Sequence, residues 1–117
     1  MKLSSSTSRY SSMMFTDIVG YSSMVGKDEK NALKLLVEHD SLIEPIINKN
    51  HGRIIKKIGD AIFAEFDEIL DCIKTAIRIQ ADLISRNKIS RDSNQIIIRI
   101  GIHYGNVYVK GNDLFGN

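Results

Sequence analysis

Apolar residues recur along this chain with two spacings, a period of two and a period of about 3.6, which is typical of alternating strands and helices. A chain with both patterns must pack helices against a sheet, because each element buries only one apolar face. Gly20–Gly26 is expected to turn the chain, and Gly59-Asp60 to form a type II′ hairpin turn. The expected strands are Tyr10–Val19, Arg53–Ile58, Ala61–Phe66, Gln95–His103 and Val107–Lys110, and the expected helices are Asp28–Asn50 and Glu68–Arg86.

The order strand, helix, hairpin, helix, strand predicts an α+β fold, a ferredoxin-like split β-α-β-β-α-β unit. Its sheet is antiparallel, with the helices on one face. With 117 residues and 43% hydrophobic residues, the chain fits one domain with its own core. Residues 1–12 are rich in Ser and are expected to form a flexible lead-in, with the domain over 13–117. This scaffold serves many functions, so only individual residues can indicate one.

Composition excludes several classes of protein. A formal charge of +2 argues against nucleic acid as a general partner. No apolar run approaches the roughly 20 residues that a membrane-spanning helix needs, and the start lacks the apolar stretch of a secretory signal, so no membrane contact is expected from this segment. One cysteine, Cys72, cannot form a disulfide framework, which favours a reducing compartment. We therefore expect a cytoplasmic domain, although a longer protein could be membrane-tethered.

Two aspartates stand where strands end. Asp17 lies in a strand, a position where a charged side chain is disfavoured without a partner, and Asp60 lies at the hairpin turn. Two carboxylates on neighbouring strand ends could hold one or two Mg²⁺ ions, which prefer oxygen ligands. The alternatives are a helix-capping role for Asp17 and a simple turn role for Asp60, since Asp is common at both places.

Two cations interrupt apolar strands. Lys56 shares the alternation of Ile54 and Ile58, and Arg99 lies between Ile97 and Gly101. Both could meet a phosphate or a nucleotide base. The alternatives are that Lys56 packs its stem and extends its ammonium group into water, and that Arg99 pairs with a structural carboxylate.

Four segments, in this order, resemble the catalytic domain of class III adenylyl and guanylyl cyclases. The segments Met14–Ser22 (MFTDIVGYS) and Lys56–Ala61 (KKIGDA) are similar to the two metal motifs of the family. Ile98–Gly105 (IRIGIHYG) is similar to its phosphate-side strand, and Asp113–Asn117 (DLFGN) to the start of its last catalytic segment. The resemblance covers nearly the whole chain from residue 13 onward.

The resemblance implies an adenylate cyclase that converts ATP to cyclic 3′,5′-AMP and pyrophosphate with two Mg²⁺ or Mn²⁺ ions. Asp17 and Asp60 would be the catalytic metal ligands, together with the backbone carbonyl of Ile18. Lys56 and Asp113 would recognise the base, a pair that favours adenine over guanine. The phosphate-binding residues implied are Val19, Gly20, Tyr21 and Arg99.

The resemblance also implies a homodimer, with composite sites that take the metal acids from one subunit and the base-recognising pair from the other. The chain ends at Asn117, before the family segment that supplies an Asn and an Arg to the site, and the last strands and helix of the family fold. Little activity is therefore expected of this fragment, since a transition-state Arg in phosphoryl transfer is worth roughly 10³-fold or more. The alternative is a non-catalytic cyclase-like domain that binds nucleotide or dimerises.

Overall fold

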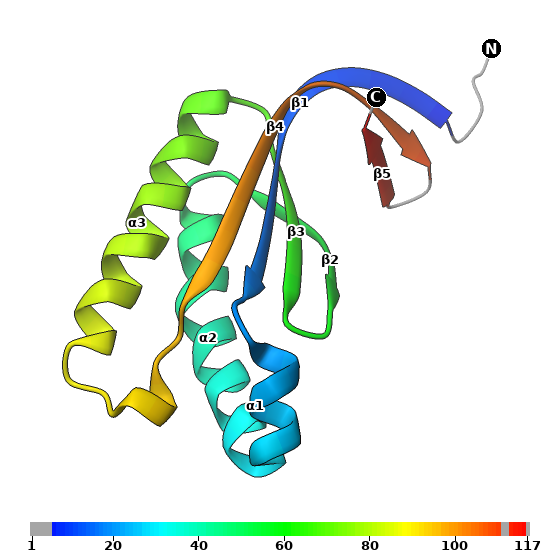
Figure 1. Cartoon of the computed structure of the whole chain (residues 1–117). Coiled ribbons are helices and arrows are strands. Elements are labelled where there is room, and N and C mark those ends of the chain that lie inside the picture. Colours follow the sequence, from blue (N-terminus) through cyan, green and yellow to red (C-terminus); the bar gives the residue numbers. More distant parts are fainter. Residues whose placement is uncertain (1–5, 111–112, 117) are drawn as a thin grey trace.

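The computed structural model describes the backbone of residues 6–110 and 113–116 and the side chains of residues 8–108. Within these ranges, no helix combines the length and the apolar character needed to cross a membrane. The chain runs from a strand through two helices, a hairpin and a third helix to two final strands (Figure 1). The elements are β1 (Ser6–Ile18), α1 (Tyr21–Lys27), α2 (Glu29–Lys49), β2 (Arg53–Ile58), β3 (Ala61–Phe66), α3 (Ile69–Asn87), a 3-10 turn (Asp92–Asn94), β4 (Ile98–Lys110) and β5 (Asp113–Gly116).

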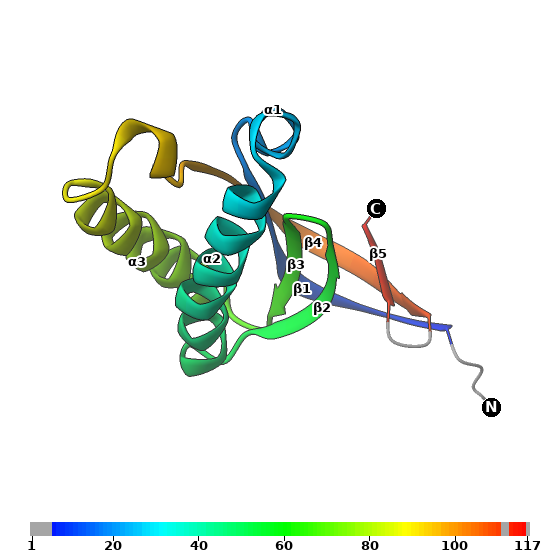
Figure 2. The same ribbon diagram turned by 90° about the horizontal axis from the view of Figure 1, so that it is seen from below.

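The sheet has the strand order β2-β3-β1-β4-β5, and all neighbouring strands are antiparallel. The long strands β1 and β4 are paired along their whole length, from Ser6 opposite Lys110 to Ile18 opposite Ile98. Helices α2 and α3 lie together on one face of the sheet (Figures 1 and 2). The predicted ferredoxin-like α+β fold is confirmed, with β5 paired to the outer edge of β4.

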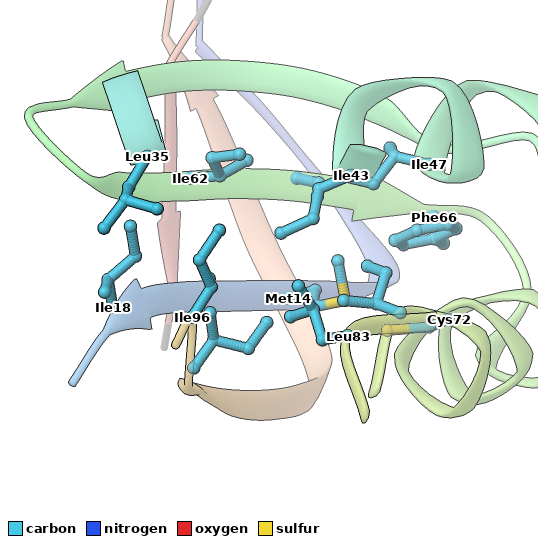
Figure 3. Packing of buried hydrophobic residues seen from close by; sticks show 13 residues of the cluster. Met14, Ile18, Leu35, Ile43, Ile47, Ile62, Phe66, Cys72, Leu83 and Ile96 are labelled. Atoms are coloured by element: carbon cyan, nitrogen blue, oxygen red, sulfur yellow. The ribbon is translucent and has the colours of Figure 1, made fainter. Parts of the chain in front are cut away.

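The main core lies between this face and the helices. Met14 and Ile18 of β1 share one side of the strand and meet aliphatic residues from α2 and α3 (Figure 3). Residues one or two turns apart on each helix share the buried side, which is why the 3.6-residue period was visible in the sequence. The helix residues of this cluster are Leu35, Ile43, Ile47, Cys72, Ile79 and Leu83.

No helix of the described residues covers the opposite face of the sheet, which we call the open face. Met13 and Val107 are buried there against Ile55 and Phe63. Farther along the same face, Phe15 is 44% exposed, so the apolar cover is incomplete. Partly exposed aromatic residues on an uncovered sheet are a common feature of ligand and partner sites.

Strand β1 begins earlier than the sequence predicts. The expected lead-in of residues 1–12 does not hold for residues 6–12, because these residues pair with Tyr104–Lys110 of β4. This part of the strand was not predicted because its residues are mostly serines, which show no apolar alternation. Ser11 and Ser12 are nevertheless buried, and Ser11 donates a hydrogen bond to Glu65 (2.7 Å).

Two further boundaries differ from the predictions. The segment Gly20–Gly26, expected as a turn, is mostly helix α1, with Gly20 at its N-cap. Strand β4 begins at Ile98 and runs without a break through Tyr104–Asn106, where the sequence suggested a gap between two strands. Continuous pairing with β1 keeps this region extended despite its polar and glycine residues.

The β2–β3 hairpin has the predicted bounds. Gly59 has φ of +57°, whereas Asp60 is not among the residues with positive φ, as in the expected type II′ turn. A bulge was not foreseen: Ile54 pairs with Ala64 and Lys56 with Phe63, which leaves Ile55 as an extra residue. A bulge re-aims the side chains that follow it, so the alternation assumed for Lys56 with Ile54 is wrong.

Candidate active site

The structure brings Asp17 and Asp60 to one pocket of about 310 Å³, which we call the carboxylate pocket. Asp17 is the penultimate residue of β1, and Asp60 follows Gly59 in the turn between β2 and β3. These points lie at the same end of the sheet because β1 and β3 are antiparallel neighbours. The other residues that line the pocket are Ile18, Gly20, Tyr21, Ser22, Ala61 and Arg99.

Asp60 ties the hairpin to the end of β1. Its Oδ2 accepts a hydrogen bond of 2.7 Å from the backbone N–H of Ile18. Its Oδ1 makes no hydrogen bond or ion pair within the part of the chain that the structure describes. Asp60 is thus a turn residue and a structural acceptor, as the simpler alternative held, and it still has one carboxylate oxygen for a ligand.

Asp17 is paired with Arg99, directly across the β1–β4 ladder. Arg99 donates from Nε to Oδ1 (2.9 Å) and from Nη2 to Oδ2 (3.2 Å). The hydrogen bond and the charge of Asp17, with a smaller contribution from Asp60, raise the pKa of Arg99. The alternative of a carboxylate partner for Arg99 is therefore realised, and the partner is the expected metal ligand itself. Asp17 does not cap α1, since Gly20 holds that position.

The start of α1 faces the same pocket through Gly20, Tyr21 and Ser22. Gly20 has φ of +74°, a left-handed conformation that other residues adopt only with strain. Burial, followed by the charge of Asp60, raises the pKa of Tyr21. The Val19 amide was expected to bind phosphate, and this prediction is wrong: its N–H donates to the carbonyl of Ile97 (2.7 Å).

A second, more apolar pocket of about 670 Å³ lies on the open face and shares Asp17, Ala61 and Arg99 with the first. Lys56 lines it, with its Nζ 5.7 Å from the centre of the Phe63 ring, a cation–π distance. The bulge in β2 explains why Lys56 reaches this face. The side chain of Asp113 lies outside the described residues, although its backbone begins β5.

The carboxylate pocket fits divalent cations in part. In the described ranges no three His, Cys, Asp or Glu side chains gather closely enough to form a metal site. Two carboxylates and a nearby backbone carbonyl are oxygen donors, however, and Mg²⁺ is commonly bound by one or two carboxylates together with substrate phosphates. The donor set therefore suits a metal that arrives with a phosphorylated ligand.

Two features of the site were not predicted from the sequence. Ser22 lines the carboxylate pocket, and it belongs to a segment that had been assigned to a turn. Phe15 and Phe63 form a wall of the apolar pocket, with their ring centroids 4.5 Å apart. The second feature depends on a contact between β1 and β3, which are distant in sequence. The MFTDIVGYS alternation placed Phe15 with Asp17, but nothing in the sequence paired it with Phe63.

Comparison with known proteins places these residues in a family. The model of the adenylate and guanylate cyclase catalytic domain matches residues 3–113. The chain is 29% identical over 110 residues to "Putative adenylate cyclase 3" of Rhizobium meliloti and 27% identical over 103 residues to an adenylate cyclase of Streptomyces coelicolor. These matches cover 93% and 87% of this chain, but only 19% and 26% of the relatives.

A solved structure gives the same answer. The adenylate/guanylate cyclase/hydrolase from Silicibacter pomeroyi is similar with a TM-score of 0.87 and 28% identity. The match covers 96% of this chain and 66% of that chain. The chain therefore spans only part of the proteins that it resembles. Sequence and fold agree that it belongs to the family of adenylate and guanylate cyclase catalytic domains.

Proposed function

We propose that the chain is part of an adenylate cyclase domain that binds ATP with divalent metal ions and forms cyclic 3′,5′-AMP and pyrophosphate. The observation that supports this most is the pocket in which a carboxylate from β1 and one from the β2–β3 turn meet a helix start and a guanidinium group. Phosphoryl-type transfer asks the protein mainly to position the substrate and to stabilise charge. Side chains of both signs around one small pocket suit that task.

In this proposal Asp17, Asp60 and the backbone carbonyl of Ile18 hold two Mg²⁺ or Mn²⁺ ions. When bound, the ions supply charge neutralisation for the triphosphate and activation of the ribose 3′-hydroxyl. The Oδ1 of Asp60, and the carboxylate of Asp17 once it separates from Arg99, are the oxygens that would hold them. The Ile18 N–H bond to Asp60 fixes the distance between the two strand ends.

The remaining residues orient the nucleotide. Arg99 and the amides of Gly20 and Tyr21 meet phosphate oxygens. In the reaction, the ribose 3′-oxygen bonds to the α-phosphorus, the bond from this phosphorus to the bridging oxygen breaks, and pyrophosphate leaves with that oxygen while the 3′-hydroxyl proton is lost to solvent. Lys56 donates to adenine N1 and Asp113 accepts from the exocyclic amine, a pattern that guanine cannot satisfy.

We also propose a homodimer built through the open face. Phe15 and Ile58 on this face are 44% and 66% exposed, and Lys56 and Asp17 lie beside them. Pairing two copies would bury these apolar groups and bring the base-recognising residues of one subunit to the metal acids of the other. Aromatic anchors surrounded by charged groups are typical of such interfaces.

The test is metal-dependent nucleotide binding, measured by equilibrium dialysis of ATP with and without Mn²⁺. Asp17→Asn and Asp60→Asn should each weaken Mn²⁺-dependent ATP binding by about tenfold or more, since each removes a charged ligand. Asp82→Asn, in an exposed pair on α3, is the matched control and should change nothing. Lys56→Glu should lower the preference for ATP over GTP.

Three outcomes are distinguishable. Formation of cyclic AMP, detected by chromatography, supports a cyclase. Binding that depends on both aspartates, with no turnover even in a chain extended past Asn117, favours the alternative of a non-catalytic nucleotide-binding domain. ATP binding that is absent, or that ignores both substitutions, overturns the proposal.

A further inference from the structure

The ion pair between Asp17 and Arg99 lines the carboxylate pocket. Both oxygens of Asp17 accept from Arg99, and the two residues face each other directly in the β1–β4 register. The pairing is therefore built into the sheet, because neighbouring residues on antiparallel strands place their side chains on the same side. The charge of Asp60 also acts on Arg99, more weakly than that of Asp17.

The proposed function asks these groups to do something else. Asp17 has to meet a metal ion, and Arg99 has to meet a phosphate. Neither can do so fully while the bidentate pair persists, since it takes both carboxylate oxygens and two of the guanidinium donors. A divalent cation arriving alone would also be repelled by the positive charge of Arg99.

The pair is well placed to open. The side chains of Arg99 and Asp17 are 72% and 42% exposed, so water solvates each partner when they separate. Exposed pairs of this kind contribute little to stability. A phosphate offers Arg99 a ligand of higher charge than a carboxylate, with the same bidentate geometry. Opening is therefore favoured when a phosphate arrives.

We propose that Arg99 is a positioning residue that couples the phosphate and metal sites. Without ligand it holds Asp17; when a nucleoside triphosphate enters, Arg99 moves from the carboxylate to the phosphate oxygens and frees Asp17 for a divalent ion. This inference rests on the proposed function and concerns the order in which its ligands bind. By linkage, any gain in metal affinity caused by the nucleotide equals the gain in nucleotide affinity caused by the metal.

The test uses two ligands separately, so that turnover plays no part. Binding of Mn²⁺ alone is measured by electron paramagnetic resonance of the free ion, and binding of α,β-methylene-ATP is measured by dialysis in EDTA. Arg99→Gln should tighten Mn²⁺ binding by about three- to tenfold, because it removes a competing and repelling cation. The same substitution should weaken metal-free nucleotide binding by a similar factor. These opposite signs are the signature of the exchange.

Arg78→Gln is the matched control, since Arg78 forms a similarly exposed pair with Asp82 on α3. It should change neither affinity. If Arg99→Gln leaves Mn²⁺ affinity unchanged or weakens it, the coupling is wrong even though the proposed function stands. If the unsubstituted chain binds neither ligand, whether alone or in the presence of the other, both the coupling and the proposed function fail.

Discussion

Two carboxylates on the open face of the sheet are paired with arginine, and they differ in almost every other respect. Glu65, opposite Met13, has a fully buried side chain that accepts from Arg9, Arg53 and Ser11 at 2.6–2.9 Å. Asp17, four residues after Met13 on β1, is 42% exposed, and Arg99 is its only side-chain partner among the described residues.

The difference shows what makes an acid structural. Burial alone would raise the pKa of Glu65, but hydrogen bonds from Arg9, Arg53 and Ser11 outweigh it and lower the pKa to about 2. All its lone pairs face the protein, so it holds the early part of β1 to β2 and β3. Asp17 keeps one exposed side and a single, separable partner. The first arrangement stabilises a fold, and the second is suited to exchanging partners with a ligand.

The largest difference between the two acids should appear on acid titration, as a loss of unfolding free energy caused by protonation of Glu65. The folded pKa of Glu65, about 2, lies below its ordinary value of 4.5, so its contribution is complete above pH 4.5 and is lost as the pH falls toward 2. The shift corresponds to about 3 kcal/mol of unfolding free energy. The measurement is urea unfolding followed by circular dichroism at a series of pH values from 7 to 2.

Glu65→Gln isolates this contribution from those of the other acids. At pH 7 it should lower the free energy of unfolding by about 2–3 kcal/mol, because two arginines lose a buried anionic partner. Between pH 5 and 2 the variant should then lose less stability than the parent chain. If the free energy of unfolding fell in parallel with pH for the two proteins, Glu65 would not stabilise the fold through its arginine contacts.

Asp60 should fall between the two extremes, since one of its oxygens is structural and the other is free. Asp60→Ala leaves the partly buried N–H of Ile18 without its acceptor and should cost about 1–2 kcal/mol. Asp60→Asn retains a carbonyl oxygen at the same place and should cost less than half as much. The same urea experiment measures both, and equal losses would mean that the turn, and not the hydrogen bond, sets the cost.

The fold was accessible from the sequence because its signals are local. Apolar alternation located the β2–β3 hairpin, and the helical period located α2 and α3 within a residue or two of each end. The early part of β1 was missed because it carries serines and an arginine in place of apolar residues. Ser11 is buried and donates to Glu65 across the sheet, and Arg9 also donates to Glu65. A buried network of polar groups leaves no apolar pattern to detect.

The site was only half accessible, for the same reason. Asp17 and Asp60 attract notice because an acid in a strand and an acid after a turn glycine are locally unusual. The Val19 N–H donates to the Ile97 carbonyl because β1 and β4 pair side by side. That Lys56 faces the open side follows from a one-residue bulge. Neither can be read from spacing, which assumes an unbroken alternation.

The smallest expected effect belongs to Asp17. Both partners of its pair with Arg99 are exposed, so Asp17→Asn should change the free energy of unfolding by no more than the change expected for Asp82→Asn. That control breaks an exposed pair four residues apart on a helix, which is worth roughly 0.5 kcal/mol or less. Urea midpoints of the two variants should therefore coincide.

A large loss of stability in Asp17→Asn would break the comparison on which the site rests. It would mean that the Asp17–Arg99 pair stabilises the pairing of its strands, as the contacts of Glu65 with Arg9 and Arg53 do. A carboxylate that stabilises the fold in this way cannot give up its partner to a ligand at low cost, because opening the pair would then carry the same penalty in every binding event. Unchanged stability, together with lost Mn²⁺-dependent nucleotide binding, is the combination expected of a ligand-binding acid.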